Sequence, residues 1–540
     1  MSAPTTSITC TRLSFAWPDG TSVLDGFELA VGPGRTGLIG VNGTGKSTLL
    51  KLVAGELAPQ EGSVRVAGEV GYLPQDLTLD TGLRVDAALG IAGTRAALHA
   101  IEAGDPSEAH FTAVGDDWDV EERARATLDQ LGLTHITLDR TIGEVSGGES
   151  VLLRLAALLL RRPDVLLLDE PTNNLDREGR RRLYDAVASW SGVLVVVSHD
   201  RELLELVDQI ADLRAGEVHW YGGNLSAYEE AVATEQEAAE RMVRVAEGDL
   251  RRQKRELAEA QTKLAKRVRY GDKMYATKRE PRAVMKLRKR SAQESAGKHR
   301  ILHEQRLEEA RERLDEASAA VRDDDEIRVD LPFTAVPAGR QVLTAREVEL
   351  RYGARAHLDV HGPERIALTG RNGAGKSTLL RTVAGLIPPE GGELTTHVPL
   401  RYLPQRLDLL DESLSLVQNV ARLAPGATDN RIRAQLARFL FKGKRAEQVV
   451  GTLSGGERFR ATLAAVMLAE PVPQLLMLDE PTNNLDMASV RQLTDALRSY
   501  EGALIVAGHD VPFLHAIEPT RWLRLDGALA TVDPEELWEG

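Results

Sequence analysis

Short apolar runs recur at both ends of the chain, each flanked by charged or turn-forming residues. Runs of this length are typical of buried strands, and the longer stretches that follow them favour helices. The pattern predicts an α/β fold in each half of the chain. The predicted strands lie at 35–39, 165–168 and 193–197 in the first half, and at 365–369, 475–478 and 503–506 in the second.

The middle of the chain, residues 223–334, has a different pattern. Apolar residues recur every seven positions from Val243 to Leu264 and again from Leu307 to Val321, with alanines at intermediate positions. This spacing gives a helix a single apolar seam. Two such helices, joined by a segment that contains Gly and Pro, are expected to pack as an antiparallel coiled-coil hairpin. About 40 residues at 1.5 Å each would give an arm of roughly 60 Å.

The sequence has no stretch suited to crossing a membrane or to directing secretion. The longest apolar runs, near 151–160 and 193–197, are short or interrupted by Arg154, and the first ten residues lack a basic and apolar signal pattern. Cys10 is the single cysteine, so no disulfide can form within the chain. These features predict a cytoplasmic protein without a membrane-spanning segment.

One series of short motifs occurs twice in the same order. It consists of a glycine-rich loop, Tyr-Leu-Pro-Gln, Ser-Gly-Gly-Glu, Leu-Asp-Glu-Pro-Thr-Asn-Asn-Leu-Asp and His-Asp. The first series runs from Gly40 to Asp200 and the second from Gly370 to Asp510. Such a repeat predicts two homologous domains with the helical segment between them. The predicted boundaries are about 5–222, 223–334 and 335–540.

The two copies differ in one internal distance. From Gln75 to Ser146 the chain advances 71 residues, whereas from Gln405 to Ser454 it advances 49. The first domain therefore carries 22 additional residues, which we place within about 85–130.

Each glycine-rich motif lies between a predicted strand and a helix-forming run, which is the setting of a P-loop. Glycines let backbone N–H groups surround phosphates, and the helix N-terminus favours negative charge. The lysine would neutralise phosphate oxygens, and the serine that follows can bind Mg²⁺. The residues predicted to bind ATP here are Asn42, Gly43, Gly45, Lys46, Ser47 and Thr48, and their counterparts Asn372, Gly373, Gly375, Lys376, Ser377 and Thr378.

Two acidic residues follow the strands at 165–168 and 475–478. Asp169 and Asp479 are placed to hold Mg²⁺ through water, and Glu170 and Glu480 to polarise the attacking water as catalytic bases. The alternative is a pair of solvated acids at a strand end.

His199 and His509 follow the strands at 193–197 and 503–506. Their imidazoles are therefore expected at the carboxyl end of the sheet, near the γ-phosphate, with a part in catalysis. A lone histidine in such a place is more often structural, but the neighbouring motifs favour the functional interpretation.

Trp17 and Tyr352 each precede a P-loop and could stack on adenine. Phe15 competes with Trp17 for this role, and a place in the core is the simpler alternative for either aromatic residue.

Charge is distributed unevenly along the chain. The net charge is −14, yet residues 261–300 hold fourteen Lys or Arg against three Asp or Glu. At the predicted hairpin turn, about 270–292, basic side chains lie among Tyr and Met, which suits contact with RNA. The alternative is a solvated helix face. The predicted RNA-binding residues of this tip are Lys286, Arg288, Lys289 and Arg290.

The order of these motifs resembles the ATP-binding cassette ATPases. Ser-Gly-Gly-Glu at a helix start can bind a γ-phosphate, but each domain already has its own P-loop for that purpose. The resemblance implies that the two cassettes pair head to tail within one monomeric chain, so that each motif serves the opposite ATP. It also implies that Gln75 and Gln405 contact ATP and Mg²⁺. The completing residues would be Ser454, Gly455, Gly456 and Glu457 for the first site, and Ser146, Gly147, Gly148 and Glu149 for the second.

Tandem cassettes, a charged helical linker, a small insertion and the Gly-Asn-Leu-Ser-Ala-Tyr motif at 223–228 together resemble the ABC-F group. The resemblance implies an ATPase that enters the tRNA exit site of the ribosome and points its linker toward the peptidyl-transferase centre. Its partners would be 23S rRNA and peptidyl-tRNA. The short insertion and sizeable tip look more like members that protect ribosomes from antibiotics. A general translation factor and the ATPase subunit of a transporter remain alternatives.

Overall fold

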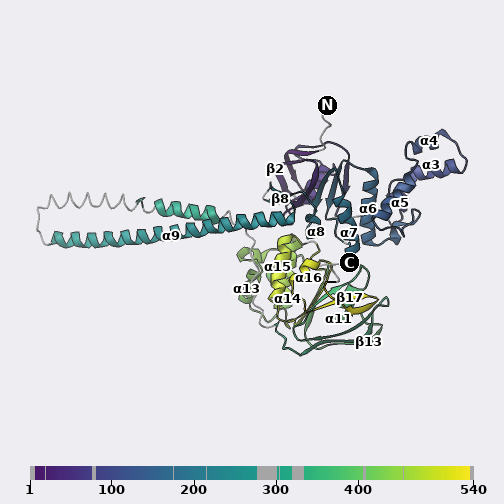
Figure 1. The fold of residues 1–540 in the computed structure, drawn as a ribbon. Coiled ribbons are helices and arrows are strands. Elements are labelled where there is room, and N and C mark those ends of the chain that lie inside the picture. Colours follow the sequence, from purple (N-terminus) through teal and green to yellow (C-terminus); the bar gives the residue numbers. More distant parts are fainter. Residues whose placement is uncertain are drawn as a thin grey trace. The chain divides into compact units, whose positions relative to one another are not determined.

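The computed structural model describes most of the chain as two compact units. One unit comprises Met1–Leu225 with Asp325–Gly540, and the other Ser226–Asp324. The first unit contains two α/β cassettes, and the described part of the second contains one long helix and a shorter helical segment at 305–318 (Figure 1). The described residues are 7–18, 20–75, 81–173, 175–214, 216–276, 301–302, 305–318, 334–405, 409–453, 455–483 and 485–535.

A mixed six-stranded sheet forms the centre of the first cassette. Its strand order is β5-β6-β7-β3-β8-β9, and all neighbours are parallel except β8 and β9. The apolar runs predicted from the sequence form its interior, because every residue of β6 and β7 is buried. The strands are β3 (Gly34–Ile39), β5 (Val70–Leu73), β6 (Val165–Asp169), β7 (Val193–Val197), β8 (Gln209–Arg214) and β9 (Glu217–Gly222).

A smaller antiparallel sheet, in the order β2-β1-β4, completes the first cassette. In the second cassette the corresponding strands belong to one nine-stranded sheet, because β11 pairs with β18 between Arg355 and Ala528. The remaining strands are β1 (Ile8–Ala16), β2 (Ser22–Val31), β4 (Glu61–Val66), β10 (Gln341–Glu349), β11 (Arg355–His361), β12 (Arg365–Thr369), β13 (Gly391–Thr396), β14 (Leu400–Leu403), β15 (Leu475–Asp479), β16 (Ala503–Ala507), β17 (Arg521–Asp526) and β18 (Ala528–Thr531).

The first cassette differs from the second in the segment between β5 and α6. Four helices, α2 to α5, stand there, whereas the second cassette has α12 and α13. The α-helices of the cassettes are α1 (Lys46–Val53), α2 (Val85–Ala88), α3 (Ala92–Glu102), α4 (Glu108–Val114), α5 (Val120–Gln130), α6 (Gly147–Arg161), α7 (Arg177–Ala188), α8 (Arg201–Leu204), α11 (Lys376–Val383), α12 (Leu416–Leu423), α13 (Asp429–Arg438), α14 (Gly455–Leu468), α15 (Met487–Arg498) and α16 (Val511–Ala516).

A cluster of ion pairs joins this insertion to the rest of the first cassette. Arg95 of α3 reaches Asp86 of α2 at 2.8 Å and Glu121 of α5 at 2.5 Å, and its Nη1 lies 2.7 Å from Asp139. The Arg95 side chain is 10% exposed and that of Asp86 6%. The hydrogen bonds that Arg95 donates to these carboxylates, first of all to Asp139, raise the pKa of Arg95 above its ordinary value. One guanidinium therefore links three helices and the segment that follows them.

We expect Arg95→Met to destabilise the first cassette by about 2–4 kcal/mol, because it leaves the buried Asp86 with Arg84 alone. The thermal unfolding temperature of the full chain should fall by several degrees. Arg125→Met is the matched control, since Arg125 is 68% exposed and lies 3.9 Å from the same Glu121. Equal unfolding temperatures for the two variants would show that the cluster contributes nothing beyond a surface pair.

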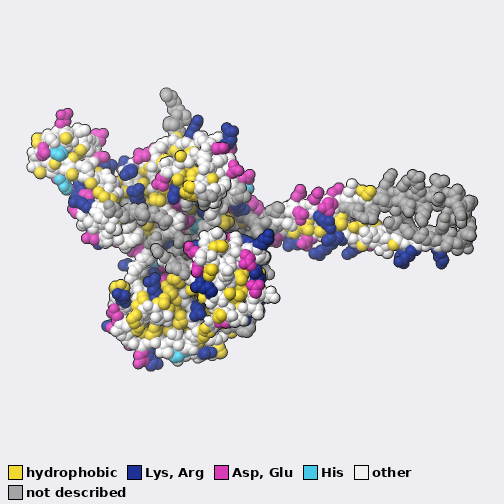
Figure 2. Space-filling model, turned by 180° about the vertical axis from the view of Figure 1, so that it is seen from behind, with side chains coloured by type: hydrophobic (Ala, Val, Ile, Leu, Met, Phe, Trp, Pro, Cys, Tyr) yellow, Lys and Arg dark blue, Asp and Glu magenta, His cyan; other side chains and the backbone are white. Residues whose placement is uncertain are grey.

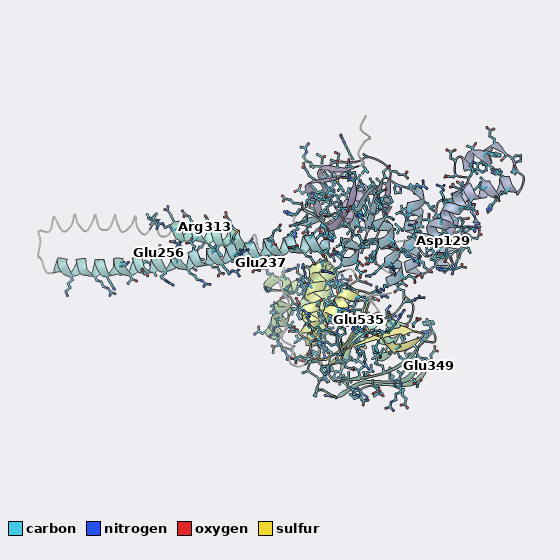
Figure 3. All side chains as sticks on the ribbon, viewed as in Figure 1. Asp129, Glu237, Glu256, Arg313, Glu349 and Glu535 are labelled. Atoms are coloured by element: carbon cyan, nitrogen blue, oxygen red, sulfur yellow. The ribbon has the colours of Figure 1, made fainter. Side chains whose placement is uncertain are left out.

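The second unit is built on α9, a single helix from Leu225 to Ala276. At 52 residues, or about 78 Å, it is longer than predicted, because the helix begins well before the apolar seam. Four described positions of the predicted seam are half-buried: Leu250 and Leu257 of α9, and Leu307 and Leu314 of the second helical segment. Arg313 donates to Asp249 at 3.0 Å, and Figure 3 places Arg313 beside α9.

Both basic and acidic side chains lie on the described part of this unit (Figure 2). The predicted tip residues Lys286, Arg288, Lys289 and Arg290 lie outside the described residues, so their interpretation stays a prediction. Within the described part of the chain, no helix is both long enough and apolar enough to cross a membrane.

Candidate functional site

The repeated motifs converge because of the strand order in the sheet. The P-loop follows β3, Asp169 ends β6, His199 comes just after β7, and Gln75 just after β5. These four strands stand in a row in the order β5-β6-β7-β3 and are parallel, so their carboxyl ends share one edge. Ligands of open parallel sheets bind at this edge. The second cassette repeats the arrangement around β12, β14, β15 and β16.

The first P-loop is shaped so closely that only glycine fits at two positions. Gly40 and Gly45 have φ of 149° and 95°. A Cβ would lie 2.5 Å from the Leu213 carbonyl oxygen at Gly40, and 2.5 Å from Val23 Cγ1 at Gly45. Helix α1 begins at the next residue, Lys46, without a side-chain cap on its N-terminus. The loop and the N–H groups of the first turn thus fit a phosphate chain.

The P-loop lysines lie over their own loops. Lys46 Nζ donates to the Gly40 carbonyl oxygen at 2.7 Å, and Lys376 Nζ donates to that of Gly370 at 2.8 Å. Both lysines are buried, and this burial lowers their pKa from the ordinary value, although nearby carboxylates oppose the shift. The two ammonium groups are therefore held at the place where phosphate oxygens would come.

Oxygen ligands suited to Mg²⁺ lie side by side in each cassette. Ser47 Oγ donates to Asp169 Oδ1 at 3.1 Å, and Ser377 Oγ donates to Asp479 Oδ1 at 3.0 Å. A hydroxyl beside a carboxylate matches the oxygen set that Mg²⁺ prefers when phosphates supply further ligands. Gln75, like Gln405, is exposed at the end of its strand.

Sequence reasoning missed a tyrosine beside each of these aspartates. Tyr72 OH donates to Asp169 Oδ2 at 3.4 Å, and Tyr402 OH donates to Asp479 Oδ2 at 2.9 Å. Both tyrosines belong to the repeated Tyr-Leu-Pro-Gln motif, and that repetition was the available signal. With serine on one oxygen and tyrosine on the other, each carboxylate is fixed in orientation.

The two candidate bases have an unusual backbone conformation. Glu170 and Glu480 have φ of 48° and 49°, in the left-handed region that is uncommon for residues other than glycine. Their N–H groups donate to Val197 and Ala507 carbonyl oxygens at 2.8 Å, which holds the turn. Burial raises the pKa of Glu480 to about 7, against the opposing charge of Lys376, and burial raises the pKa of Glu170 also.

The two histidines differ in their contacts. His199 Nε2 lies 3.3 Å from Glu170 Oε1, but neither ring nitrogen forms a hydrogen bond with any described residue. Lys376 Nζ donates to His509 Nε2 at 2.8 Å, and that nitrogen lies 3.4 Å from Glu480 Oε1. Burial lowers the pKa of both imidazoles, so they are neutral at physiological pH.

The Ser-Gly-Gly-Glu motif starts a helix in both cassettes. Ser146 caps α6 by accepting from Glu149 N at 3.3 Å, and the Glu149 side chain accepts from Ser146 N at 2.8 Å. Ser146 and Gly147 are exposed, so they are accessible to an ATP held by the other cassette. Gly455 begins α14, while Ser454 lies outside the described residues. The residues Gly148, Gly456 and Glu457 fall in the first turns of these helices.

The structure separates the candidates for adenine stacking. Phe15 is buried, and its ring meets that of Trp17 edge-on with centroids 5.2 Å apart. Trp17 is 38% exposed and Tyr352 87%. Trp17 and Tyr352 are therefore the aromatic residues available to a base, and Phe15 belongs to the core.

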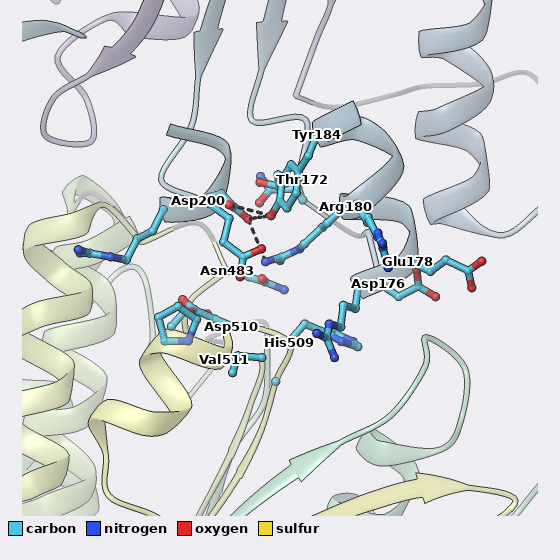
Figure 4. A pocket seen from close by; sticks show the side chains of 18 of the residues that line it. Thr172, Asp176, Glu178, Arg180, Tyr184, Asp200, Asn483, His509, Asp510 and Val511 are labelled. Atoms are coloured by element: carbon cyan, nitrogen blue, oxygen red, sulfur yellow. Dashed lines mark hydrogen bonds and ion pairs between the residues drawn. The ribbon is translucent and has the colours of Figure 1, made fainter. Parts of the chain in front are cut away.

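The two cassettes meet at their P-loops and at the helices that follow the Asn-Asn-Leu-Asp segments. The Asn42 N–H donates to Asp486 Oδ2 at 2.9 Å, and Arg371 lies 3.8 Å from Glu178. A cavity of about 790 Å³ lies between the cassettes, and Glu170, His199 and His509 are among its lining residues. Figure 4 shows this cavity with His509 labelled.

Comparisons with known proteins agree with this geometry. A family model described as ABC transporter matches residues 24–173 and 354–483. The chain is 32% identical to the probable ATP-binding protein YheS of Escherichia coli K12, over 95% of this chain and 78% of that protein. It is 34% identical to the tylosin resistance ATP-binding protein TlrC of Streptomyces fradiae, over 91% and 92%.

A third relative is the energy-dependent translational throttle protein EttA of Mycobacterium tuberculosis, at 30% identity over 91% of this chain and 87% of that protein. Among solved structures, the RNase-L inhibitor superposes with a TM-score of 0.54 at 18% identity, covering 94% of this chain and 87% of that one. This last similarity concerns the fold alone.

Proposed function

Because this chain belongs to the ATP-binding cassette family and to its ABC-F subfamily, we propose that it acts on the ribosome, with ATP binding and hydrolysis controlling its association. The chain is an ATPase that binds ATP. The observation that carries the rest is the combination of two copies of the site motifs with a charged helical segment between them.

Each cassette provides its own set of residues for hydrolysis. The P-loop holds the phosphates, with Lys46 or Lys376 neutralising their oxygens. The carboxylates of Glu170 and Glu480 accept a proton from the attacking water, and the neighbouring histidines orient that water toward the γ-phosphate. Mg²⁺, when bound through Ser47 and Asp169 or through Ser377 and Asp479, offsets the negative charge of the phosphates.

The exposed Ser-Gly-Gly-Glu helix starts complete the opposite sites in this proposal. Each helix N-terminus would face a γ-phosphate held by the other cassette, so that closure depends on ATP. The contact between Asn42 and Asp486 supports such pairing, because it joins the first P-loop to the second cassette.

Two features support a ribosomal partner. One relative is named for translational throttling and another for tylosin resistance. The helical unit carries the basic segment 261–300 in an otherwise acidic chain, and such a segment suits the phosphates of 23S rRNA. In this proposal the unit enters the tRNA exit site and its tip approaches the peptidyl-transferase centre and peptidyl-tRNA.

Within this proposal we favour protection of the ribosome from an antibiotic. The relative named for tylosin resistance matches over nearly its whole length, and the insertion α2–α5 is short. A general translation factor is the second candidate, which the relative named for translational throttling supports. The ATPase subunit of a transporter is the third, and it leaves the basic helical unit without a role.

Sucrose-gradient sedimentation tests the ribosomal proposal. We expect the Glu170→Gln, Glu480→Gln double variant, loaded with ATP, to migrate with ribosomes, because it binds ATP without releasing it by hydrolysis. The same variant with ADP is the control and should remain near the top of the gradient. If the ATP-loaded variant also remains near the top of the gradient, ribosomal action is excluded. If it pellets with membrane vesicles, the transporter alternative is favoured.

A further inference from the structure

The glutamate of each Ser-Gly-Gly-Glu motif brings a negative charge to a helix start. The N-terminus of a helix favours anions, but a carboxylate beside a phosphate repels it. Burial would raise the pKa of Glu149, yet hydrogen bonds from Ser146 and His135 hold it below its ordinary value, so the side chain is charged. Binding of a γ-phosphate at this helix start therefore depends on what holds and shields the carboxylate.

In the first cassette, a residue outside the motif occupies one oxygen of this carboxylate. Glu149 Oε2 accepts from the Ser146 N–H at 2.8 Å, and Oε1 lies 2.6 Å from His135 Nε2. An ionised carboxylate only accepts hydrogen bonds, so His135 Nε2 is the donor. His135 belongs to the segment between α5 and α6. Both oxygens are thus held, one within the motif and one by this histidine.

The second cassette makes the same kind of contact from a different position in the sequence. Arg445 Nη2 donates to Glu457 Oε1. Arg445 lies 12 residues before its glutamate, whereas His135 lies 14 before its own. Counted back from the motif, the counterpart of His135 is Gly443 and that of Arg445 is Thr137. A requirement of the glutamate explains this coincidence, and the repeat of the sequence does not.

The held glutamate leaves the other groups of the first motif open. Glu149 N donates to Ser146 Oγ at 3.3 Å, so the hydroxyl oxygen is the acceptor there and its own hydrogen can point to a phosphate oxygen. Ser146 and Gly147 are exposed, and a Cβ added to Gly147 would meet no other described atom within 4 Å. This side of the helix start is therefore accessible to a ligand from outside the cassette.

We propose that His135 and Arg445 are positioning residues of the two Ser-Gly-Gly-Glu motifs: each holds and shields the motif's glutamate, so that the helix start can engage the γ-phosphate of the opposite ATP. The proposal rests on the pairing of the motifs with opposite ATP sites proposed above. His135 serves the second ATP site, because Glu149 belongs to the first cassette, and Arg445 serves the first. Without these donors the carboxylate is free to turn and repel the phosphate.

The test measures ATP hydrolysis by the full-length chain at varied ATP concentration. His135→Ala and Arg445→Ala, combined in one chain, should raise KM for ATP about three- to fivefold, the contribution of a partly exposed ion pair, with kcat within about twofold. The change lies in KM because the contact acts on bound ATP before any bond breaks. An unchanged KM, or a fall in kcat alone, overturns the proposal.

A double-mutant cycle separates this role from a structural one. Glu149→Gln with Glu457→Gln removes the charge that has to be held, and glutamine is equally suited to this helix position. In that background, adding His135→Ala and Arg445→Ala should have no further effect on KM. If the two alanines raise KM by the same factor in both backgrounds, they act on the surrounding loops and not through the glutamates, and the proposal is overturned.

His110→Ala is the matched control. His110 Nε2 lies 3.1 Å from Asp105 in the insertion, where it forms the same kind of partly exposed pair away from either motif. The substitution should leave KM for ATP unchanged. A rise equal to that of the His135→Ala, Arg445→Ala chain would show that the effect is not specific to the motifs, which contradicts the proposal.

Gly147→Asp distinguishes a failure of this proposal from a failure of the proposed function. It places a carboxylate on the open side of the helix start, where the first cassette itself has room for it. If the motif meets the opposite ATP, hydrolysis should fall by at least half, because one of two sites is lost. Unchanged hydrolysis would overturn the pairing and this proposal with it. Reduced hydrolysis together with a wild-type KM in the alanine chain would overturn only the role of His135 and Arg445.

Discussion

Replacing Glu170 and Glu480 together with Gln should lower ATP hydrolysis by about 10² or more and leave ATP binding nearly intact. Glutamine has the shape of glutamate and can occupy the same left-handed turn, which the N–H bonds to Val197 and Ala507 hold in place. It cannot accept a proton from water. The expected loss therefore lies in the chemical step, and the closed ATP-bound pair of cassettes should persist.

Phosphate release measures the hydrolysis, and fluorescence of a labelled ATP analogue measures its binding. Glu102→Gln is the control, because Glu102 is exposed at the end of α3 and does not line the cavity. It should stay within about twofold of the wild-type rate. Hydrolysis at the wild-type rate in the double variant would show that neither glutamate is the base.

The arrangement of the sheet was largely predictable, because phosphate-binding loops and buried strands each have a recognisable local sequence pattern. The runs at 165–168 and 193–197 form fully buried strands, and the Asp, Glu and His that follow them reach one edge. A helix at 243–264 was also predictable, since a helix that packs on one side must repeat its apolar residues, and these residues belong to α9. A count of residues between the motifs likewise predicted 22 additional residues in the first cassette, within about 85–130.

What the sequence did not reveal depends on contacts between distant segments. The hydrogen bond from Tyr402 to Asp479 requires that β14 and β15 be neighbours in the sheet, and no local sequence pattern predicts that pairing. The left-handed φ of Glu170 follows from the way its N–H meets β7. The contact from His135 to Glu149 has no counterpart at the same position of the repeat, so comparing the two copies does not indicate it.

The hairpin tip carries the second large effect that we expect. Changing Lys286, Arg288, Lys289 and Arg290 to Ala should weaken ribosome binding most at low salt, because the acidic cassettes cannot supply the attraction to rRNA. The salt slope of binding falls by roughly 0.7–0.9 for every phosphate that is no longer neutralised, so the four substitutions together correspond to about 3. At 0.1 M salt the loss in affinity would then approach about a thousandfold.

The control removes the same charge from elsewhere in the helical unit. Changing Arg241, Arg244, Arg251 and Lys254 of α9 to Ala also lowers the net charge by four, and these side chains are exposed. If binding reflects only net charge, the two quadruple variants will weaken it alike, and the assignment of the tip to RNA fails. If the tip contacts RNA, only the tip variant will lose affinity and salt dependence.

Growth of cells that carry tip variants then separates the two ribosomal roles. Met285 and Leu287 lie among the basic residues and could reorder rRNA near a drug site. For a protein that protects ribosomes, Met285→Ala with Leu287→Ala should abolish drug tolerance without slowing drug-free growth. Slower drug-free growth would instead identify a general translation factor, because the contact would then be needed in every round of translation.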